Sequence, residues 1–145
     1  MSMRRKGREL ALQVLYQLEM SGDASETALH KFAESFDHSP RARAFGEALV
    51  RGVLDRRAEI DASIASASEH WRMERLSRVD ANVIRVAVYE MTTAPALPIE
   101  IAIDEAIEVA RKFGTAESAA FVNGVLDEVA TRLGLKDASR IRDQH

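Results

Sequence analysis

Apolar side chains recur at helical spacing along almost the whole chain, and this periodicity constrains the fold more than any other feature. In the first periodic segment, Leu10, Val14 and Leu18 follow one another at intervals of four residues. Ala11 and Leu15 lie beside them, and residues so spaced share one face of an α-helix. Alternating strand patterns are scarce, and helix breakers are few, with 3 Pro and 7 Gly in 145 residues. We therefore predict an all-α protein.

Local start and stop signals divide the periodic segments into helices. The first helix is expected over residues 8–20. Ser25, Ser39 and Ser77 are of a residue type that caps helix N-termini, and Pro40 follows Ser39 where proline suits the first turn. These positions mark the starts of three further helices.

Later breaks in the pattern set the remaining helix ends. The helix that begins at Pro40 is long, and it either bends near Gly52 or breaks near residues 56–58. Gly114 occupies the position after a helix where glycine is usual, and Thr115 is expected to cap the last helix. About seven helices result.

Length and composition indicate one domain. The chain has the usual size of a single domain, and a hydrophobic fraction of 46% is enough for a core. We predict a compact bundle of about seven helices over 1–135, with halves at about 1–66 and 67–135, and a polar tail at 136–145.

The amino-acid composition also indicates where in the cell the protein is located. The absence of cysteine excludes disulfides and thiolate metal sites. No apolar run approaches the roughly 20 residues that a membrane span needs, and no apolar segment follows the basic N-terminus as it would in a secretory signal. We expect a cytoplasmic protein that does not contact membrane.

A search for catalytic groups finds no convincing site. The histidines His30, His38, His70 and His145 lack the spacing of a helical metal site, and no glycine-rich phosphate loop or nucleophile motif is present. Asp104 and Glu108 share a helix face and could do acid–base work, but a solvated acidic face is the simpler interpretation. We predict neither catalysis nor a bound metal or cofactor.

The basic N-terminus is the strongest functional signal from bare chemistry. Arg4, Arg5, Lys6 and Arg8 stand together without an acid, while the chain as a whole has a net charge of −3. Cations disfavour a helix N-terminus because of the macrodipole, so the cluster has a reason other than helix stability. Contact with RNA or DNA phosphates is one interpretation, and a charged tail that aids solubility is the other.

Aromatic residues beside the apolar stripes suggest further contacts. Phe121 lies next to the stripe residue Val122, near Glu117 and Asn123, where an aromatic ring could stack an unpaired base or wedge between helices. Tyr16 flanks the first stripe and could contact a partner protein.

Three segments together resemble the NusB family of bacterial transcription antitermination factors. Residues 4–16, RRKGRELALQVLY, resemble its arginine-rich first helix, and residues 79–90, VDANVIRVAVYE, resemble a second family segment. The most specific part is residues 98–127, in which AIDEA and ARKFG precede SAAFVNGVLD. The resemblance covers about residues 3–133.

The resemblance implies a helical fold of two bundled halves that carries no cofactor and no catalysis. Family members pair with the ribosomal protein NusE and bind the boxA sequence of nascent ribosomal RNA transcripts, which supports processive transcription by the RNA polymerase antitermination complex. Some members are monomers and others homodimers. The RNA contacts of the family map onto Arg4, Arg5, Lys6, Arg8, Glu117, Phe121 and Asn123, and its partner contacts map onto Tyr16 and Asp80.

This chain departs from the family pattern at one RNA-contacting segment, and the resemblance also leaves an alternative function. Ala119 and Ala120 stand where some relatives carry basic residues, so the second RNA patch is expected to be weaker in charge. NusB-like domains also occur in ribosomal RNA methyltransferases, so a protein-interaction module without its catalytic part is the alternative function.

Overall fold

The computed structural model describes residues 2–67 and 76–136. In these two stretches the chain forms only helices, as the periodicity predicts. The helices are α1 (Met3–Ser21), α2 (Glu26–Glu34), α3 (Pro40–Asp55), α4 (Arg57–Ala67), α5 (Arg78–Thr93), α6 (Ile99–Phe113) and α7 (Ser118–Arg132). The predicted all-α bundle of about seven helices is confirmed.

The first helix begins at Met3 and not, as predicted, at residue 8. Ser2 provides the missing signal, because its Oγ accepts a hydrogen bond of 3.1 Å from the amide of Arg5 and so caps an open helix terminus. The N-terminal cations are held on the first turns of α1 instead of in a tail that precedes it.

The other predicted serine caps are confirmed. The Oγ atoms of Ser25, Ser39 and Ser77 each accept a hydrogen bond from the backbone amide three residues later, at 3.0–3.2 Å. The long helix expected from Pro40 onward breaks near residues 56–58 and does not merely bend near Gly52. Arg56, between α3 and α4, leaves helical geometry with φ −113° and ψ 17°.

The junction of α6 and α7 differs from the prediction. Gly114 does follow the last residue of α6, but its backbone is extended (φ −96°, ψ −157°) and not left-handed. Glycine is needed there because a Cβ would lie 2.3 Å from Ser118 Oγ. Thr115 does not cap α7. Its amide instead donates a 2.9 Å hydrogen bond to Ser118 Oγ, which closes a tight turn.

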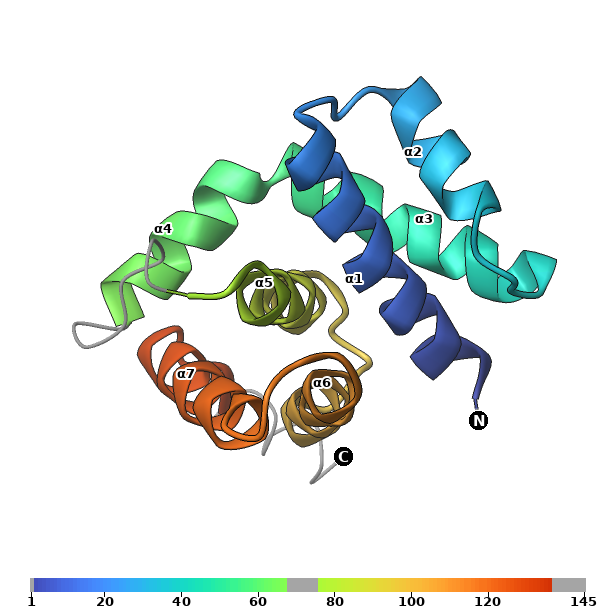
Figure 1. Ribbon diagram of the computed structural model, residues 1–145. Helices are drawn as coiled ribbons and strands as arrows, with labels where there is room; N and C mark the ends of the chain where they lie inside the picture. The colour runs from blue at the N-terminus through green and yellow to red at the C-terminus, as the bar shows by residue number, and fades with distance from the viewer. Residues whose placement is uncertain (1, 68–75, 137–145) are drawn as a thin grey trace.

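The helices pack in two groups around α5 (Figure 1). α1 lies across α3 with α2 beside both, while α6 and α7 pack against each other and against α5. α4 leads from α3 to the second group, where it contacts α5 and α7. Because α1 also packs on α5 and α6, the two groups share an interface.

One continuous core joins all these helices. Every helix contributes a side chain that is at most 1% exposed: Leu10, Leu29, Val50, Ile64, Ile84, Ile99 and Leu126, in chain order. In the part of the chain that the structure describes, no helix is both long and apolar enough to cross a membrane.

Candidate nucleic-acid interface

The cations of α1 fall into two classes by burial and pairing. Arg4 and Lys6 are exposed, and neither forms an ion pair with any residue in the described ranges. Arg5 is half-buried and Arg8 is buried, and both are paired with glutamates. Two residues along a helix turn a side chain by about 200°, so Arg4 and Lys6 point to opposite sides of α1.

Arg8 is held in the interior by Glu90 of α5. Its Nε and Nη2 donate hydrogen bonds of 2.7 and 2.9 Å to the two carboxylate oxygens, and both side chains are only 7% exposed. Glu105 lies 3.8 Å from the same guanidinium. A bidentate pair of this kind occupies the edge of the guanidinium that a phosphate would bind. In this structure Arg8 fastens α1 to α5.

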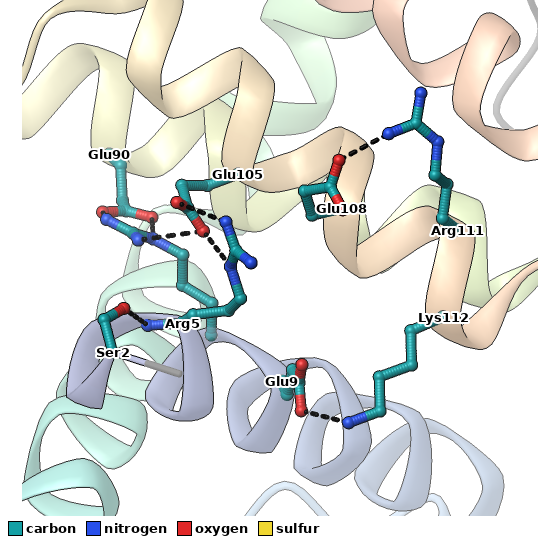
Figure 2. A network of polar contacts seen from close by, with 9 residues as sticks. Ser2, Arg5, Glu9, Glu90, Glu105, Glu108, Arg111 and Lys112 are labelled. Carbon is teal, nitrogen blue, oxygen red and sulfur yellow. Dashed lines mark hydrogen bonds and ion pairs between the residues drawn. The ribbon is translucent and has the colours of Figure 1, made fainter.

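Arg5 reaches across to α6, as Figure 2 shows. Its Nε and Nη2 donate hydrogen bonds of 2.9 and 3.1 Å to Glu105. The hydrogen bond from Arg5 lowers the pKa of the Glu105 carboxyl and raises that of the guanidinium. One turn further along the same interface, Lys112 Nζ donates a 2.9 Å hydrogen bond to Glu9. Arg5 is 35% exposed, so it is accessible but already engaged.

Neither glutamate that pairs with Arg5 or Arg8 was predicted from the sequence. Glu90 and Glu105 lie 82 and 100 residues from their partners. No local spacing rule connects groups so far apart. Only the packing of α1 against α5 and α6 reveals that half of the basic cluster is neutralised within the protein.

The predicted RNA contacts of α7 do not form one surface. Glu117 is exposed and accepts a hydrogen bond from Thr115 Oγ1. Phe121 is half-buried and packs against the core, a position that fits both the wedge and the stacking interpretation. Asn123 is exposed, and at about 200° from Phe121 it faces another way.

Asn123 lies along an open cavity of about 380 Å³ between α6 and α7. Three acids, Glu100, Asp104 and Asp127, line this cavity with Lys136. A surface rich in carboxylates repels phosphate, and the alanines at 119 and 120 add no positive charge nearby. The α7 side of the predicted interface is therefore poor in cations.

The predicted partner residues lie at a groove lined largely by apolar side chains. The groove holds about 250 Å³ and is lined by Leu12, Gln13, Tyr16, Gln17, Phe36, Val79 and Phe113. It brings Tyr16 of α1 next to Val79, the sequence neighbour of Asp80. Asp80 Oδ1 is buried without a hydrogen-bond partner among the described residues. Phe36, just after α2, and Phe113, the last residue of α6, were not predicted as part of this site.

The described residues contain no group of three or more histidines or acids that could hold a metal ion. His70 and His145 lie outside them, as does the tail at 137–145. Glu108, one of the two acids considered for acid–base work, is paired with Arg111. In the part of the chain that the structure describes, the arrangement offers surfaces for binding.

The fold and this site define a class of protein: an all-helical binding module that displays cations on its first helix and a partly aromatic groove beside it. Comparison with known proteins identifies the family. A sequence model described as the NusB family matches residues 5–131, and the chain belongs to that family.

Curated relatives of similar length carry the name transcription antitermination protein NusB. The protein of Citrifermentans bemidjiense is 43% identical over 145 residues, covering 94% of this chain and all of the relative. That of Geobacter sulfurreducens is 46% identical over 134 residues, covering 92% of this chain and 97% of the relative.

Solved structures agree with this assignment. A structure of T. maritima NusB is 37% identical and superposes with a TM-score of 0.78 over 88% of this chain and 90% of its own. A crystal structure of the antitermination factors NusB and NusE in complex with dsRNA has a TM-score of 0.78 over 90% of this chain and 97% of its own, at 22% identity. The latter likeness concerns the fold.

Proposed function

We propose that this protein is a transcription antitermination factor that binds boxA RNA of nascent ribosomal RNA transcripts together with the ribosomal protein NusE, and that it has no catalytic activity. The observation that carries the proposal is the display of Arg4 and Lys6, exposed and without an ion pair among the described residues, in a chain whose relatives are named antitermination proteins. It acts in the cytoplasm as part of the RNA polymerase antitermination complex, with a homodimer as the alternative state of the free protein.

The predicted RNA residues take different parts in this proposal. Arg4 and Lys6 contact phosphates directly, and Arg5 joins them when a phosphate replaces Glu105. Phe121 stacks an unpaired base, with Glu117 and Asn123 at its flanks. Arg8 supports the site from within, because removing it from Glu90 would leave a buried carboxylate without a partner.

The first test is a titration of labelled boxA RNA with the protein and NusE. The double variant Arg4→Ala/Lys6→Ala should bind more weakly, and log K should depend less on log salt by about 0.7 for each lost phosphate contact. The matched control is Arg56→Ala/Arg132→Ala, which removes two exposed cations that have no ion pair to residues 2–67 and 76–136. Equal affinity and salt dependence for the two double variants would refute this assignment.

The role of Phe121 has its own test. Phe121→Ala should weaken RNA binding by about 1–3 kcal/mol if the ring stacks a base, with the thermal melt checked in parallel. Phe121→Tyr keeps the ring and is the control, expected to bind normally. If the alanine variant is folded and binds RNA as tightly as the parent, the ring is a wedge between helices.

The groove beside Tyr16 is the proposed docking site for NusE. An aromatic side chain in a pocket is the usual centre of a protein interface, where truncation costs about tenfold or more in affinity. Tyr16→Ala should lower the affinity for NusE in calorimetry, and Asp80→Asn should do so by removing a charge beside the groove. Glu59→Ala, at an exposed position of α4 outside the groove, serves as the control. Unchanged affinity for the first two variants would move the partner site elsewhere.

The alternative function is a protein-interaction module from a ribosomal RNA methyltransferase. The two curated relatives described above match over 97% and 100% of their own length under the antitermination name, which favours the first proposal. Binding of NusE without any RNA binding would favour the alternative.

A further inference from the structure

Cations without an ion pair gather where the N-terminal ends of α1 and α3 meet. Among the described residues, Arg4 and Lys6 of α1 and Arg41 and Arg43 of α3 lack ion pairs. The buried Nε of Arg43 has no hydrogen-bond partner either. By contrast, Arg51, towards the C-terminal end of α3, is paired with Glu26 and Glu47.

The two segments are in direct contact. A Cβ added at Gly7 would lie 3.1 Å from the carbonyl oxygen of Ala42 and 2.6 Å from the ring of Phe45. Neither residues 2–8 nor residues 39–46 contain an acid. The crossing of α1 and α3 therefore brings together two stretches that carry only positive charge.

Phe45 connects the cations of the two helices. The guanidinium of Arg4 lies 5.9 Å from the centre of its ring, and that of Arg8 lies 5.6 Å from it. Arg41 is one turn before Phe45 on the same face of α3, about 6 Å along the helix axis. Arg43 is rotated by about 200° from Arg41 around the axis of α3, so its side chain points away from the face that carries Arg41 and Phe45. We call Arg4, Phe45 and Arg41 the α1–α3 basic row.

We propose that the α1–α3 basic row binds the phosphate backbone of single-stranded RNA, so that the RNA path continues from Arg4 on α1 to Arg41 on α3. The proposal rests on the RNA-binding function proposed above and extends it to a helix not previously assigned to it. A guanidinium over an aromatic face keeps its N–H edge free for a phosphate. Phe45 thus holds Arg4 in place without consuming its hydrogen-bond donors.

The chemistry of the row favours a polyanion over a protein partner. Protein interfaces depend on packed pockets that take up large side chains. The row presents exposed cations around one half-buried ring, and its residues line none of the cavities described above. Evenly spaced phosphates need only charge and hydrogen-bond donors.

Arg41→Ala tests the proposal in the complete protein with NusE and boxA RNA that is extended by flanking nucleotides on both sides. Loss of one single-strand phosphate contact should lower affinity about fivefold at 0.1 M salt, with no difference near 1 M, because log K changes by about 0.7 per decade of salt. Arg56→Ala is the matched control. Arg56 is exposed at the other end of α3 and has no ion pair within the described part of the chain.

The outcomes separate this proposal from the one on which it rests. If Arg4→Ala weakens binding while Arg41→Ala behaves as Arg56→Ala does, the extension onto α3 is wrong and RNA binding by α1 stands. If neither Arg4→Ala nor Arg41→Ala has an effect, both proposals fail. If Arg41→Ala lowers affinity for NusE alone and leaves RNA affinity unchanged, α3 is a protein contact and the proposal is overturned.

Phe45→Leu tests the link between the two helices. Leucine keeps an apolar side chain against Gly7 but removes the ring beneath Arg4. The loss of RNA affinity should not add to that of Arg4→Ala in a double-mutant cycle, because both changes disrupt the same contact. Additive losses would overturn the role of Phe45. Should Phe45→Leu fail to fold, Arg41→Ala still decides the proposal.

Discussion

Arg4, Arg5, Lys6 and Arg8 are similar in chemistry, but their neighbours give them different tasks. Arg8 is enclosed with Glu90, Arg5 is held by Glu105 at a half-exposed site, and the other two are open to solvent. Burial decides the difference, since a buried charge must be paired whereas an exposed one is free to bind a ligand. A count of basic residues therefore overstates the charge that an RNA strand would meet.

Arg8 should contribute more to the stability of the fold than to RNA binding. We expect Arg8→Leu to lower the free energy of unfolding by about 3–5 kcal/mol, because Glu90 would remain buried and unpaired. The double variant Arg8→Leu/Glu90→Leu should recover much of the loss. Urea unfolding measures the free energy of unfolding of the single and the double variant. If the double variant is no more stable than the single one, the buried pair is not the cause.

Glu105 should make stability depend on pH. Its pKa is lowered in the folded state by the hydrogen bond from Arg5, so its contribution is complete above the ordinary value of 4.5 and is lost as pH falls through the lowered value. We expect Glu105→Gln to cost about 1 kcal/mol at pH 7 and progressively less below pH 4.5. Urea unfolding at pH 7, 5 and 3 should show this trend, and a constant difference would contradict it.

At the scale of elements, the approach of α1 to α3 depends on two glycines. A Cβ at Gly46 would lie 2.7 Å from the carbonyl oxygen of Gly7, and one at Gly7 would meet both Phe45 and the backbone of Ala42. The crossing therefore requires residues without side chains at this point. This close contact also brings the N-terminal ends of the two helices together.

Two glycines inside helices should respond in opposite ways to alanine. Alanine is favoured over glycine in a helix by about 1 kcal/mol, so Gly124→Ala should stabilise the protein, since nothing lies within 4 Å of the added Cβ. Gly7→Ala should destabilise it by about 1–3 kcal/mol through overpacking at the crossing. Thermal melts of the two variants provide the comparison, and a stabilised Gly7→Ala would show that α1 and α3 can separate at little cost.

At the scale of the whole molecule, a buried arginine joins the two helical groups. Arg85 of α5 donates hydrogen bonds of 2.7 Å to Glu19 of α1 and 2.9 Å to Asp61 of α4. Together with the continuous core, this makes independent unfolding of either group costly. We propose that residues 1–135 are one domain whose predicted halves do not separate.

A single cooperative transition should follow from that architecture. Urea unfolding followed by far-UV circular dichroism should coincide with hydrogen exchange of core amides in both α1 and α7. Arg85→Met should shift both probes together. The control is Arg132→Met, at an exposed position with no ion pair to the described residues. Two separate transitions would show that the helical groups are distinct domains.

Local rules predicted most of the elements. Apolar periodicity located the helices, and serine caps at 25, 39 and 77 located three of their starts. The errors also have local causes. Ser2 was not considered as a cap, so α1 was started too late, and the turn around Gly114 depends on contact with Ser118, which conformational preference alone does not indicate.

The candidate site was predicted as a set of residues and not as an arrangement. Phe121 and Asn123 were grouped with the N-terminal cations by resemblance, but they lie on different sides of α7. The groove residue Phe36 follows the end of α2 and Phe113 is the last residue of α6, and no pattern within either helix connects them. The RNA and partner roles of all these residues remain predictions for the experiments above.

Spacing and motifs along the chain are enough to predict the fold class, most helix starts and the family, because each depends on residues that are near one another in the sequence. Which cations are available depends instead on how the helices pack. Arg5 and Arg8 are neutralised by glutamates far away in sequence, and Arg41 is brought towards Arg4 by the crossing at Gly7. Electrostatic pairing acts through space, and distances through space are set by packing.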